Sequence, residues 1–200
     1  MPSLERKIWN KFHVKRRDNL PYAGWYGNRN VLAEFLGEEG FNNGAEIGVH
    51  KGRYSEILCK ANSNINLLCV DPWSAWRRKL TIERQEQYLA IAKERLKDHN
   101  VTFVRKDSMD AVRDIEDNSL DFVYIDGRHE FDYVMMDIIC WSQKVRPGGI
   151  VSGHDFIHCY GEGVIVAAEA YVKAHNIQSW YLTERAKDVA CIPSFFWVKK

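Results

Sequence analysis

The pattern of apolar and polar positions predicts strands and helices that alternate along the chain after an N-terminal segment. Short apolar runs predict strands, and longer segments with apolar residues at helical spacing predict helices. The predicted strands are 44–47, 67–70, 101–104, 120–125 and 150–152, and the predicted helices are 30–36, 55–60, 81–97, 132–144 and 163–175. The helix over 132–144 is expected to stop at Pro147-Gly-Gly149. Residues 180–182 and 194–198 are expected to form a closing antiparallel pair.

Regular alternation of strand and helix predicts an α/β fold with a parallel, doubly wound sheet and helices on both faces. In such sheets the carboxyl ends of the strands carry the functional side chains. We therefore take the polar residues at those ends as the site candidates. They are Glu46, Asp71, Asp107, Asp126 and the cluster Gly153-His-Asp155.

The bulk composition fits one globular domain. The chain has 200 residues, 46% of them hydrophobic, with a formal net charge of +1. So small a charge exerts no broad pull on nucleic acid or anionic lipid, which favours a small-molecule substrate. No apolar stretch approaches the ~20 residues of a membrane span, and no secretory signal is seen. Five cysteines without C-x-x-C pairs indicate a reducing cytoplasm.

Residues 44–55 (GAEIGVHKGRYS), followed by 67–71 (LLCVD), carry the most informative motif of the chain. Gly48 and Gly52 allow a tight turn and close approach to a ligand. Asp71 ends the next strand 71 − 48 = 23 residues after Gly48, near the roughly 20 residues of a nucleoside-cofactor fingerprint. Its carboxylate can accept hydrogen bonds from two ribose hydroxyls. The sequence therefore predicts a nucleoside-cofactor site.

The turn lacks the middle glycine that a dinucleotide site needs, because Val49, His50 and Lys51 separate its two glycines. The pattern E-x-G-x-x-x-G, with Tyr54-Ser55 following, resembles motif I of the class I S-adenosylmethionine-dependent methyltransferases. This resemblance implies S-adenosylmethionine as the cofactor and a Rossmann-like, seven-stranded, mostly parallel sheet. It covers residues 30–198, so we expect a methyltransferase domain over 30–200 and a separate N-terminal segment over 1–29.

The resemblance implies a role for each matching position around the cofactor. Glu46 would help to place the methionine ammonium, and Gly48 would pass close to the cofactor; the alternative is an ion pair with a lysine and an ordinary turn. Trp73 would cover the adenine face or simply pack. Asp107, with Ser108 beside it, would receive the adenine amino group; the alternative is an N-cap for a helix over 109–115. The full set of expected cofactor residues is Glu46, Gly48, Gly52, Tyr54, Ser55, Asp71, Trp73, Asp107, Ser108 and Asp126.

Two further blocks carry a second resemblance. Residues 120–131 (LDFVYIDGRHEF) and 147–156 (PGGIVSGHDF) resemble the Y-I-D-G-x-H-x-[YF] and G-G-x-x-x-G-H-D-[YF] blocks of a methyltransferase family. That family is related to catechol-type, antibiotic-sugar and cephalosporin-biosynthesis O-methyltransferases. The resemblance implies methyl transfer to a hydroxyl group of a small molecule, such as a sugar or another natural product.

Methyl transfer to a hydroxyl requires alignment of the acceptor and removal or weakening of its proton. Asp126 and Asp155 end adjacent predicted strands and could bind one divalent cation, such as Mg²⁺, that lowers the hydroxyl pKa. His129 and His154 are the candidate bases, or form structural hydrogen bonds. Catechol-type enzymes have an asparagine ligand directly after the second aspartate, where this chain has Phe156. Metal-assisted and metal-free mechanisms therefore both stay open.

Several segments are placed around the site rather than in it. Asp137 and Trp141 are left outside, with Asp137 as an exposed helix residue. Residues 20–27 could form a lid, and the loop 156–163 is expected at the pocket mouth; packing or a homo-oligomer contact is the alternative for each. The basic run 11–17 is a solvated arm or meets an acidic partner. The competing functions are a nicotinamide-dependent oxidoreductase and a non-catalytic cofactor-binding scaffold.

Overall fold

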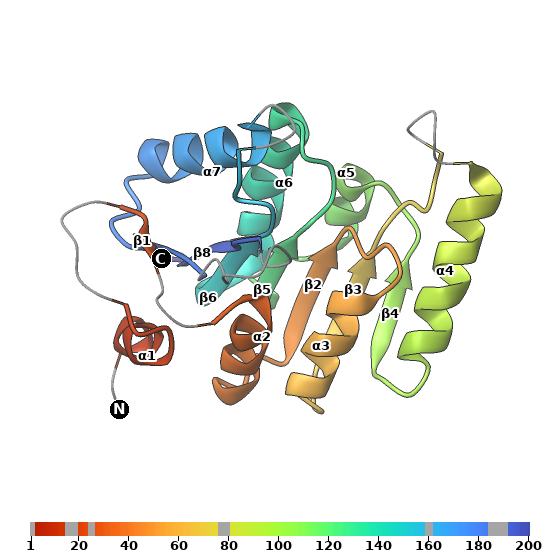
Figure 1. Ribbon diagram of the computed structural model, residues 1–200, viewed down its shortest axis with the longest axis horizontal. Helices are drawn as coiled ribbons and strands as arrows, with labels where there is room; N and C mark the ends of the chain where they lie inside the picture. Colours follow the sequence, from red (N-terminus) through yellow and green to blue (C-terminus); the bar gives the residue numbers. More distant parts are fainter. Residues whose placement is uncertain (1–2, 15–19, 24–26, 76–80, 159–161, 184–191) are drawn as a thin grey trace.

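The computed structural model describes residues 3–14, 20–23, 27–75, 81–158, 162–183 and 192–200. One mixed sheet runs through the whole molecule (Figure 1). Its strands, in the spatial order β1-β7-β8-β6-β5-β2-β3-β4, are β1 Tyr22–Ala23, β2 Asn43–Ile47, β3 Asn66–Val70, β4 Val101–Val104, β5 Leu120–Ile125, β6 Val145–Gly153, β7 Trp180–Leu182 and β8 Phe195–Val198. The expected seven strands and the expected mostly parallel sheet are confirmed, and the two-residue β1 adds an eighth strand at the edge, parallel to β7.

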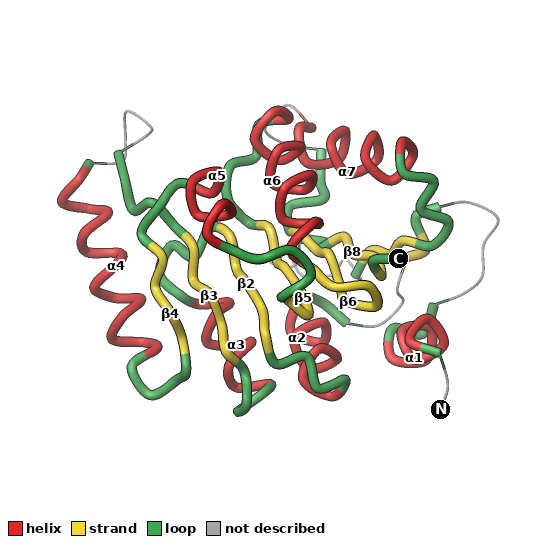
Figure 2. The backbone as a smooth tube through the Cα atoms, turned by 180° about the vertical axis from the view of Figure 1, so that it is seen from behind, coloured by secondary structure: helices red, strands yellow, loops and turns green. Residues whose placement is uncertain are grey.

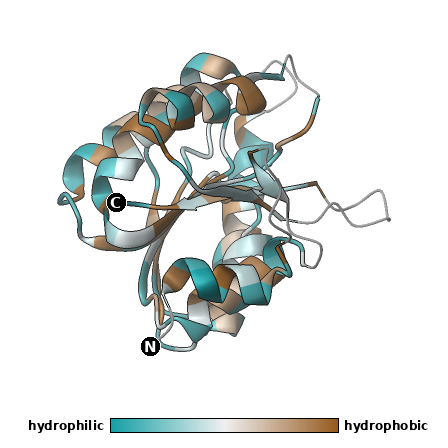
Figure 3. Cartoon of the chain, turned by 90° about the vertical axis from the view of Figure 1, so that its left-hand side faces the viewer, coloured by the Kyte–Doolittle hydropathy of each residue, from teal (hydrophilic) through white to brown (hydrophobic). Residues whose placement is uncertain are grey.

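Helices cover both faces of the sheet, as the alternating pattern predicts (Figures 2 and 3). On one face lie α1 Leu4–Lys11, α2 Arg29–Glu38, α3 Arg53–Ala61 and α4 Ile82–Leu96. On the other face lie α5 Ser108–Ala111, the 3₁₀ turn η1 Val112–Asp114, α6 Phe131–Lys144 and α7 Gly163–Ala174. Two apolar layers result, one on each side of the sheet.

Strand β5 shows how the sheet divides the core. Successive side chains of a strand point to opposite faces. Phe122 and Tyr124 accordingly pack in the layer under α1–α4, whereas Val123 and Ile125 pack in the layer under α5–α7. All four are at most 4% exposed. A strand buried on both faces reads as a continuous apolar run, which is why the sequence predicted it within its observed limits.

The closing strands behave as expected. Strand β8 pairs antiparallel with both β6 and β7, so the predicted antiparallel pair is confirmed. Strand β2 lies between β3 and β5, and all three are parallel. The chain leaves β2 through α3 on one face of the sheet and leaves the neighbouring β5 through α6 on the other face, which creates the topological switch point where α/β proteins bind ligands.

Two elements differ from the sequence-based expectation. Strand β6 begins at Val145, directly after α6, and includes Pro147-Gly-Gly149, which was expected to stop the helix and lies outside the predicted strand 150–152. Its pairing with β5 shifts register between Leu120 and Phe122, and this irregularity accommodates the proline.

The second difference is a helix in the N-terminal segment, where none was predicted. The segment over residues 1–29 contains α1, whose Ser3 side chain accepts a hydrogen bond from the Arg6 amide.

Parts of other predicted features fall outside the described residues. These are 15–17 of the basic run, 24–26 of the predicted lid, 159–161 of the predicted mouth loop, and the cysteines Cys159 and Cys191. The described part of the predicted lid includes β1, where Tyr22 contacts Trp9 and Tyr181. Cys59, Cys69 and Cys140 are free thiols. None of the described helices combines the length and apolar character needed to cross a membrane.

Candidate active site at the sheet switch point

The turn after β2 packs directly against the end of β5. Gly48 has φ +95°, and a Cβ placed there would lie 2.1 Å from the carbonyl oxygen of Asp126. The Gly48 amide donates to the Val70 carbonyl at 2.8 Å, and the Asp126 amide donates to the Ile47 carbonyl at 2.7 Å. A side chain at position 48 is therefore excluded both by conformation and by space. Gly52, at φ +71°, is the N-cap of α3.

Glu46 is a buried acid below this turn. It is 2% exposed, and one of its carboxylate oxygens accepts a hydrogen bond from the Ser55 hydroxyl. Burial raises the pKa of Glu46 to about 8, and the nearby Asp126 adds to the rise while Ser55 opposes it. The hydrogen-bond partner is thus a hydroxyl of α3, not the lysine that the alternative interpretation required. A buried acid of this kind is ready to pair with a bound cation.

Asp71 holds two loops at the end of β3. Its Oδ2 accepts from the His50 amide at 2.9 Å, and its Oδ1 accepts from the Trp73 amide at 2.7 Å. Burial raises the Asp71 pKa despite these bonds. Trp73 is 1% exposed, and its indole donates to the His50 carbonyl at 2.9 Å. This geometry favours the packing interpretation of Trp73, whereas the two Asp71 oxygens together can accept more hydrogen bonds than these backbone amides supply.

Tyr54 and Arg29 join α2 to α3 at the same edge. The Tyr54 hydroxyl donates to the Arg29 carbonyl at 2.9 Å, and the Tyr54 ring lies 4.2 Å from the Tyr124 ring. Arg29 Nη1 lies 3.6 Å from Asp126 Oδ2, and its guanidinium carbon is 5.2 Å from the centre of the Tyr54 ring. The sequence analysis missed Arg29, because this residue precedes every motif. The sequence offers one indication of its position: Asn28, directly before it, is a residue that favours the N-cap of a helix, and it caps α2.

Asp126, His154, Asp155 and His129 meet where β5 and β6 end. His154 Nδ1 lies 3.7 Å from Asp126 Oδ1 and 3.4 Å from Asp155 Oδ1. His129 Nε2 lies 2.9 Å from Asp155 Oδ2. The structure thus brings together all four residues that the sequence assigned to catalysis.

Electrostatics separates the two acids of this group. Burial raises the pKa of Asp126 to about 6, although His154 lowers it. Burial also acts to raise the pKa of Asp155, but hydrogen bonds from His129 and His154 outweigh it and hold that pKa well below its usual range. Asp155 is therefore the permanent negative charge that orients the two imidazoles.

The β4–α5 turn contributes the last two predicted cofactor residues. The Asp107 side chain caps α5 by accepting from the Met109 amide at 3.2 Å, as the alternative interpretation expected. The Ser108 hydroxyl donates to Asp137 and accepts from the Trp141 indole at 2.7 Å. Asp137 is 5% exposed, so the expectation that it lies on the helix surface is wrong. It sits on the face of α6 that packs against α5, which the sequence did not reveal.

Comparison with known proteins decides the family. A model of the methyltransferase domain matches residues 45–156, which include both motif regions. The chain belongs to the methyltransferase domain family. An uncharacterised protein of Sinorhizobium fredii, y4gI, is 31% identical over 120 residues, which are 55% of this chain and 12% of that relative. The chain thus spans only about an eighth of that relative's length.

Solved methyltransferases share the fold at low identity. An O-methyltransferase from Bacillus cereus, crystallised with S-adenosylhomocysteine, matches with a TM-score of 0.65 and 13% identity, over 98% of this chain and 88% of that one. The O-methyltransferase TomG from Streptomyces achromogenes, crystallised with S-adenosylmethionine, matches with a TM-score of 0.63 and 14% identity over 100% of both chains. The chain therefore carries a methyltransferase domain with the class I fold.

The acids of this methyltransferase also form a candidate cation site. Asp126, His154 and Asp155 each offer a ligand atom, and these atoms lie within 4.8 Å of one another. Two carboxylates and one imidazole suit a divalent cation that keeps several waters. Phe156 adds no ligand, because its ring packs against Trp180 and Phe195. The donor set fits a cation, but its third donor is the imidazole of His154 instead of the asparagine oxygen of the catechol-type pattern.

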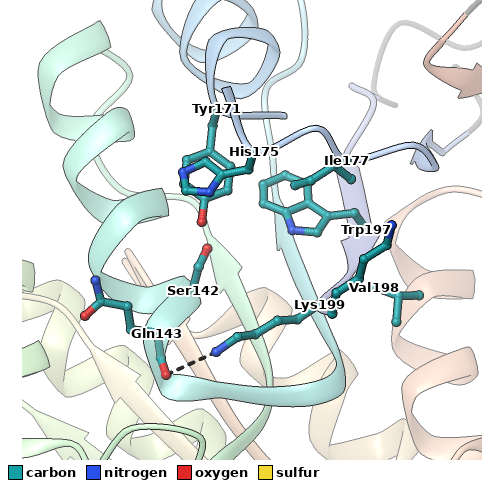
Figure 4. Close-up of a pocket in the computed structure, with 9 residues that line it drawn as sticks. Ser142, Gln143, Tyr171, His175, Ile177, Trp197, Val198 and Lys199 are labelled. Carbon is teal, nitrogen blue, oxygen red and sulfur yellow. Dashed lines mark hydrogen bonds between the residues drawn. The ribbon is translucent and has the colours of Figure 1, made fainter. Parts of the chain in front are cut away.

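A separate hollow lies at the other end of the strands, away from the switch point (Figure 4). Its volume is about 230 Å³, and it lies between the ends of α6, α7 and β8. Tyr171 stacks on His175 and on Trp197 there, and Lys199 donates to the Gln143 carbonyl at 3.3 Å. It contains none of the motif residues, and it faces the amino end of β6. The motif residues therefore lie at the switch point and not in this hollow.

Proposed function

We propose that the protein is an S-adenosylmethionine-dependent O-methyltransferase that acts on a small hydroxylated molecule, such as a sugar or another natural product. One observation carries the proposal: Glu46, Asp71 and Asp126 meet at the switch point of a methyltransferase fold, beside a glycine turn without a phosphate cradle. The O-methyltransferases of B. cereus and S. achromogenes, crystallised with this cofactor or its product, support the choice of cofactor and reaction.

The proposed cofactor seat uses charges that match an adenosyl amino acid. Asp71 accepts hydrogen bonds from the ribose hydroxyls, and Asp107 accepts one from the adenine amino group. Glu46 pairs with the methionine ammonium, and Arg29 pairs with the methionine carboxylate. Support for the last two comes from the buried acid and the neighbouring guanidinium, because a zwitterion needs one partner of each sign.

Bound S-adenosylmethionine supplies an electrophilic methyl group. The role of this chain is then to align the acceptor oxygen and to take its proton. His129 accepts that proton in the proposal, because Asp155, 2.9 Å away, stabilises the imidazolium that forms. Asp126 and His154 line the same end of the sheet and position the acceptor. A divalent cation, where used, would be held by Asp126, Asp155 and His154 and would lower the pKa of the acceptor hydroxyl.

The competing functions have weaker support. A nicotinamide-dependent oxidoreductase would need backbone amides free for a pyrophosphate, whereas the His50 amide donates to Asp71. A scaffold without turnover would not need the His129–Asp155 pair. Ligand binding and turnover assays separate these alternatives.

The test is thermal unfolding of the full chain with S-adenosylhomocysteine or with NAD. A ligand at a hundredfold excess over its Kd stabilises the fold by about 2.7 kcal/mol. We expect a rise in Tm with S-adenosylhomocysteine and none with NAD. Asp71→Asn keeps an acceptor for the backbone amides but loses the charge, so it should raise the Kd of the product about tenfold. A shift with NAD alone would overturn the proposal.

Turnover and the cation are tested in a second assay. Methyl transfer from labelled S-adenosylmethionine to a panel of hydroxylated sugars and phenols is measured in EDTA and in excess Mg²⁺. His129→Gln should abolish most transfer while leaving cofactor binding intact. Activity that persists in EDTA would mean that His129 takes the acceptor proton without a metal. Activity that returns only with Mg²⁺ would mean that Asp126 and Asp155 hold a required cation.

A further inference from the structure

A buried hydrogen-bonded group links α6 to the β4–α5 turn. The Ser108 hydroxyl donates to Asp137 and accepts from the Trp141 indole, so both of its hydrogen-bonding roles are used. Trp141 is fully buried, and Asp137 is 5% exposed. Both come from one face of α6, and Ser108 is the first residue of α5. One serine is thus fixed from two points of a neighbouring helix.

The Asp137 carboxyl also touches a second turn. A Cβ placed on Gly127 would lie 3.8 Å from Asp137 Oδ2, so this oxygen is in contact distance of the residue that follows Asp126. The other oxygen, Oδ1, is the one that accepts from Ser108. Asp137 therefore stands between the turn of Asp107 and Ser108 and the turn of Asp126, the proposed adenine end and the reacting end of one site.

An acid is an unusual choice for this position. Burying a carboxyl costs free energy, and an apolar side chain of similar size would pack between helices without that cost. What the acid adds is a directed acceptor for Ser108. Helix α5 has only four residues, too few to be stable by itself, so its position depends on such anchors. Asp107, which caps α5, moves with it.

We infer that Asp137 is a positioning residue for the cofactor base: it anchors Ser108, and through Ser108 it fixes the Asp107 carboxylate that accepts the adenine amino group. The inference rests on the proposed function, because it assumes an adenosyl ligand at this turn. Asp137 itself touches neither base nor acceptor. Asp137 therefore affects how much more tightly the site binds adenine than a base of the same shape.

The test compares two ligands, S-adenosylhomocysteine and S-inosylhomocysteine, by isothermal titration calorimetry. The second carries a carbonyl in place of the amino group, so it cannot donate to Asp107. The wild-type protein should prefer the adenosyl ligand by roughly tenfold or more, since a mismatched polar group is left unpaired. In Asp137→Ala this preference should fall below about threefold. Asp137→Asn, whose amide oxygen still accepts from Ser108, should keep it.

Controls separate positioning from loss of structure. Asp132→Asn changes an exposed acid of the same helix and should leave both affinities unchanged. Ser108→Ala removes the same hydrogen bond from the other side and should reduce the preference as Asp137→Ala does; it decides the question if Asp137→Ala does not fold. Equal weakening of both ligands in these variants, or an unchanged preference, overturns the inference. Wild-type protein that binds neither ligand overturns the proposed function as well.

Discussion

Arg29 Nη1 and Asp126 Oδ2 face each other across 3.6 Å at the switch point of the sheet. This separation is longer than a hydrogen bond, so the guanidinium keeps donors for another anion. The Arg29 side chain is 32% exposed, and its main-chain carbonyl is fixed by Tyr54. A guanidinium that lies near two acids, Asp126 and Glu46, is suited to a ligand that carries both a positive and a negative group.

The Arg29 contact predicts how the site recognises the methionine carboxylate. Arg29→Ala should raise the Kd of S-adenosylhomocysteine about tenfold, because one charge-assisted contact is lost. The decarboxylated analogue should bind the variant and the wild type alike. Arg113→Ala, which removes a side chain that is 76% exposed, is the matched control. Equal losses for both ligands would show that Arg29 only supports the fold.

Burial of Glu46 predicts that cofactor binding releases a proton. Its pKa of about 8 in the free protein means that the carboxyl is mostly protonated at pH 7. A bound ammonium favours the charged form, so affinity should rise with pH from about 6 to 8. Calorimetry in buffers of different ionisation enthalpy measures the proton directly. Glu46→Gln should abolish the buffer dependence, and a wild-type signal without it would remove Glu46 from the ammonium site.

The contact at Gly48 predicts a large and local loss of stability. Gly48→Ala would combine φ +95° with a Cβ 2.1 Å from the Asp126 carbonyl oxygen. We expect it to lower the free energy of unfolding by about 2–4 kcal/mol. Gly40 is the matched control, because its φ is +70° but no atom lies within 4 Å of the added Cβ. Gly40→Ala should therefore show only the conformational part, about 1 kcal/mol. Equal losses in urea unfolding would contradict the contact.

Asp137 predicts a distinct pH dependence of folding. Burial raises its pKa to about 7, above the unfolded value of 3.8, with Asp107 adding to the rise and Ser108 opposing it. The folded protein therefore retains a proton that the unfolded chain releases, and stability falls as pH rises from about 4 to 7. The slope from this group is at most about 1.4 kcal/mol per pH unit. Asp137→Asn should flatten that part of the curve in urea titrations; Asp107 and Cys140, the titratable groups that interact with Asp137, are left in place.

The strands and their acids were predictable because burial on both faces leaves a plain signal in the sequence. A short apolar run such as 120–125 is typical of a buried strand, and the parallel sheet then brings Glu46, Asp71 and Asp126 to the carboxyl ends of neighbouring strands. Spacing within motif I and the two later blocks pointed to the same edge. That part of the site follows from local pattern and topology.

Contacts between elements could not be predicted in this way. Arg29 comes from the start of α2 and meets Asp126 only through the packing of that helix on the sheet. Asp137 reads as a surface acid because neither Ser108 nor Trp141 is paired with it by sequence spacing. Pro147 reads as a terminator, yet β6 passes through it by a register shift. The position of each of these residues depends on a contact with a segment that is distant in the sequence, so the neighbouring residues alone do not reveal it.

The first residue of α7 returns to the turn that carries the proposed base. A Cβ at Gly163 would lie 2.2 Å from the His129 carbonyl oxygen and 2.6 Å from the Phe131 amide nitrogen, so the two main chains touch there. The chain that continues from β6 past Asp155 thus returns to His129 where α7 begins. Under the proposed function, any change of sequence between Asp155 and Gly163 has to keep this main-chain contact, because it holds the turn that carries the proposed base.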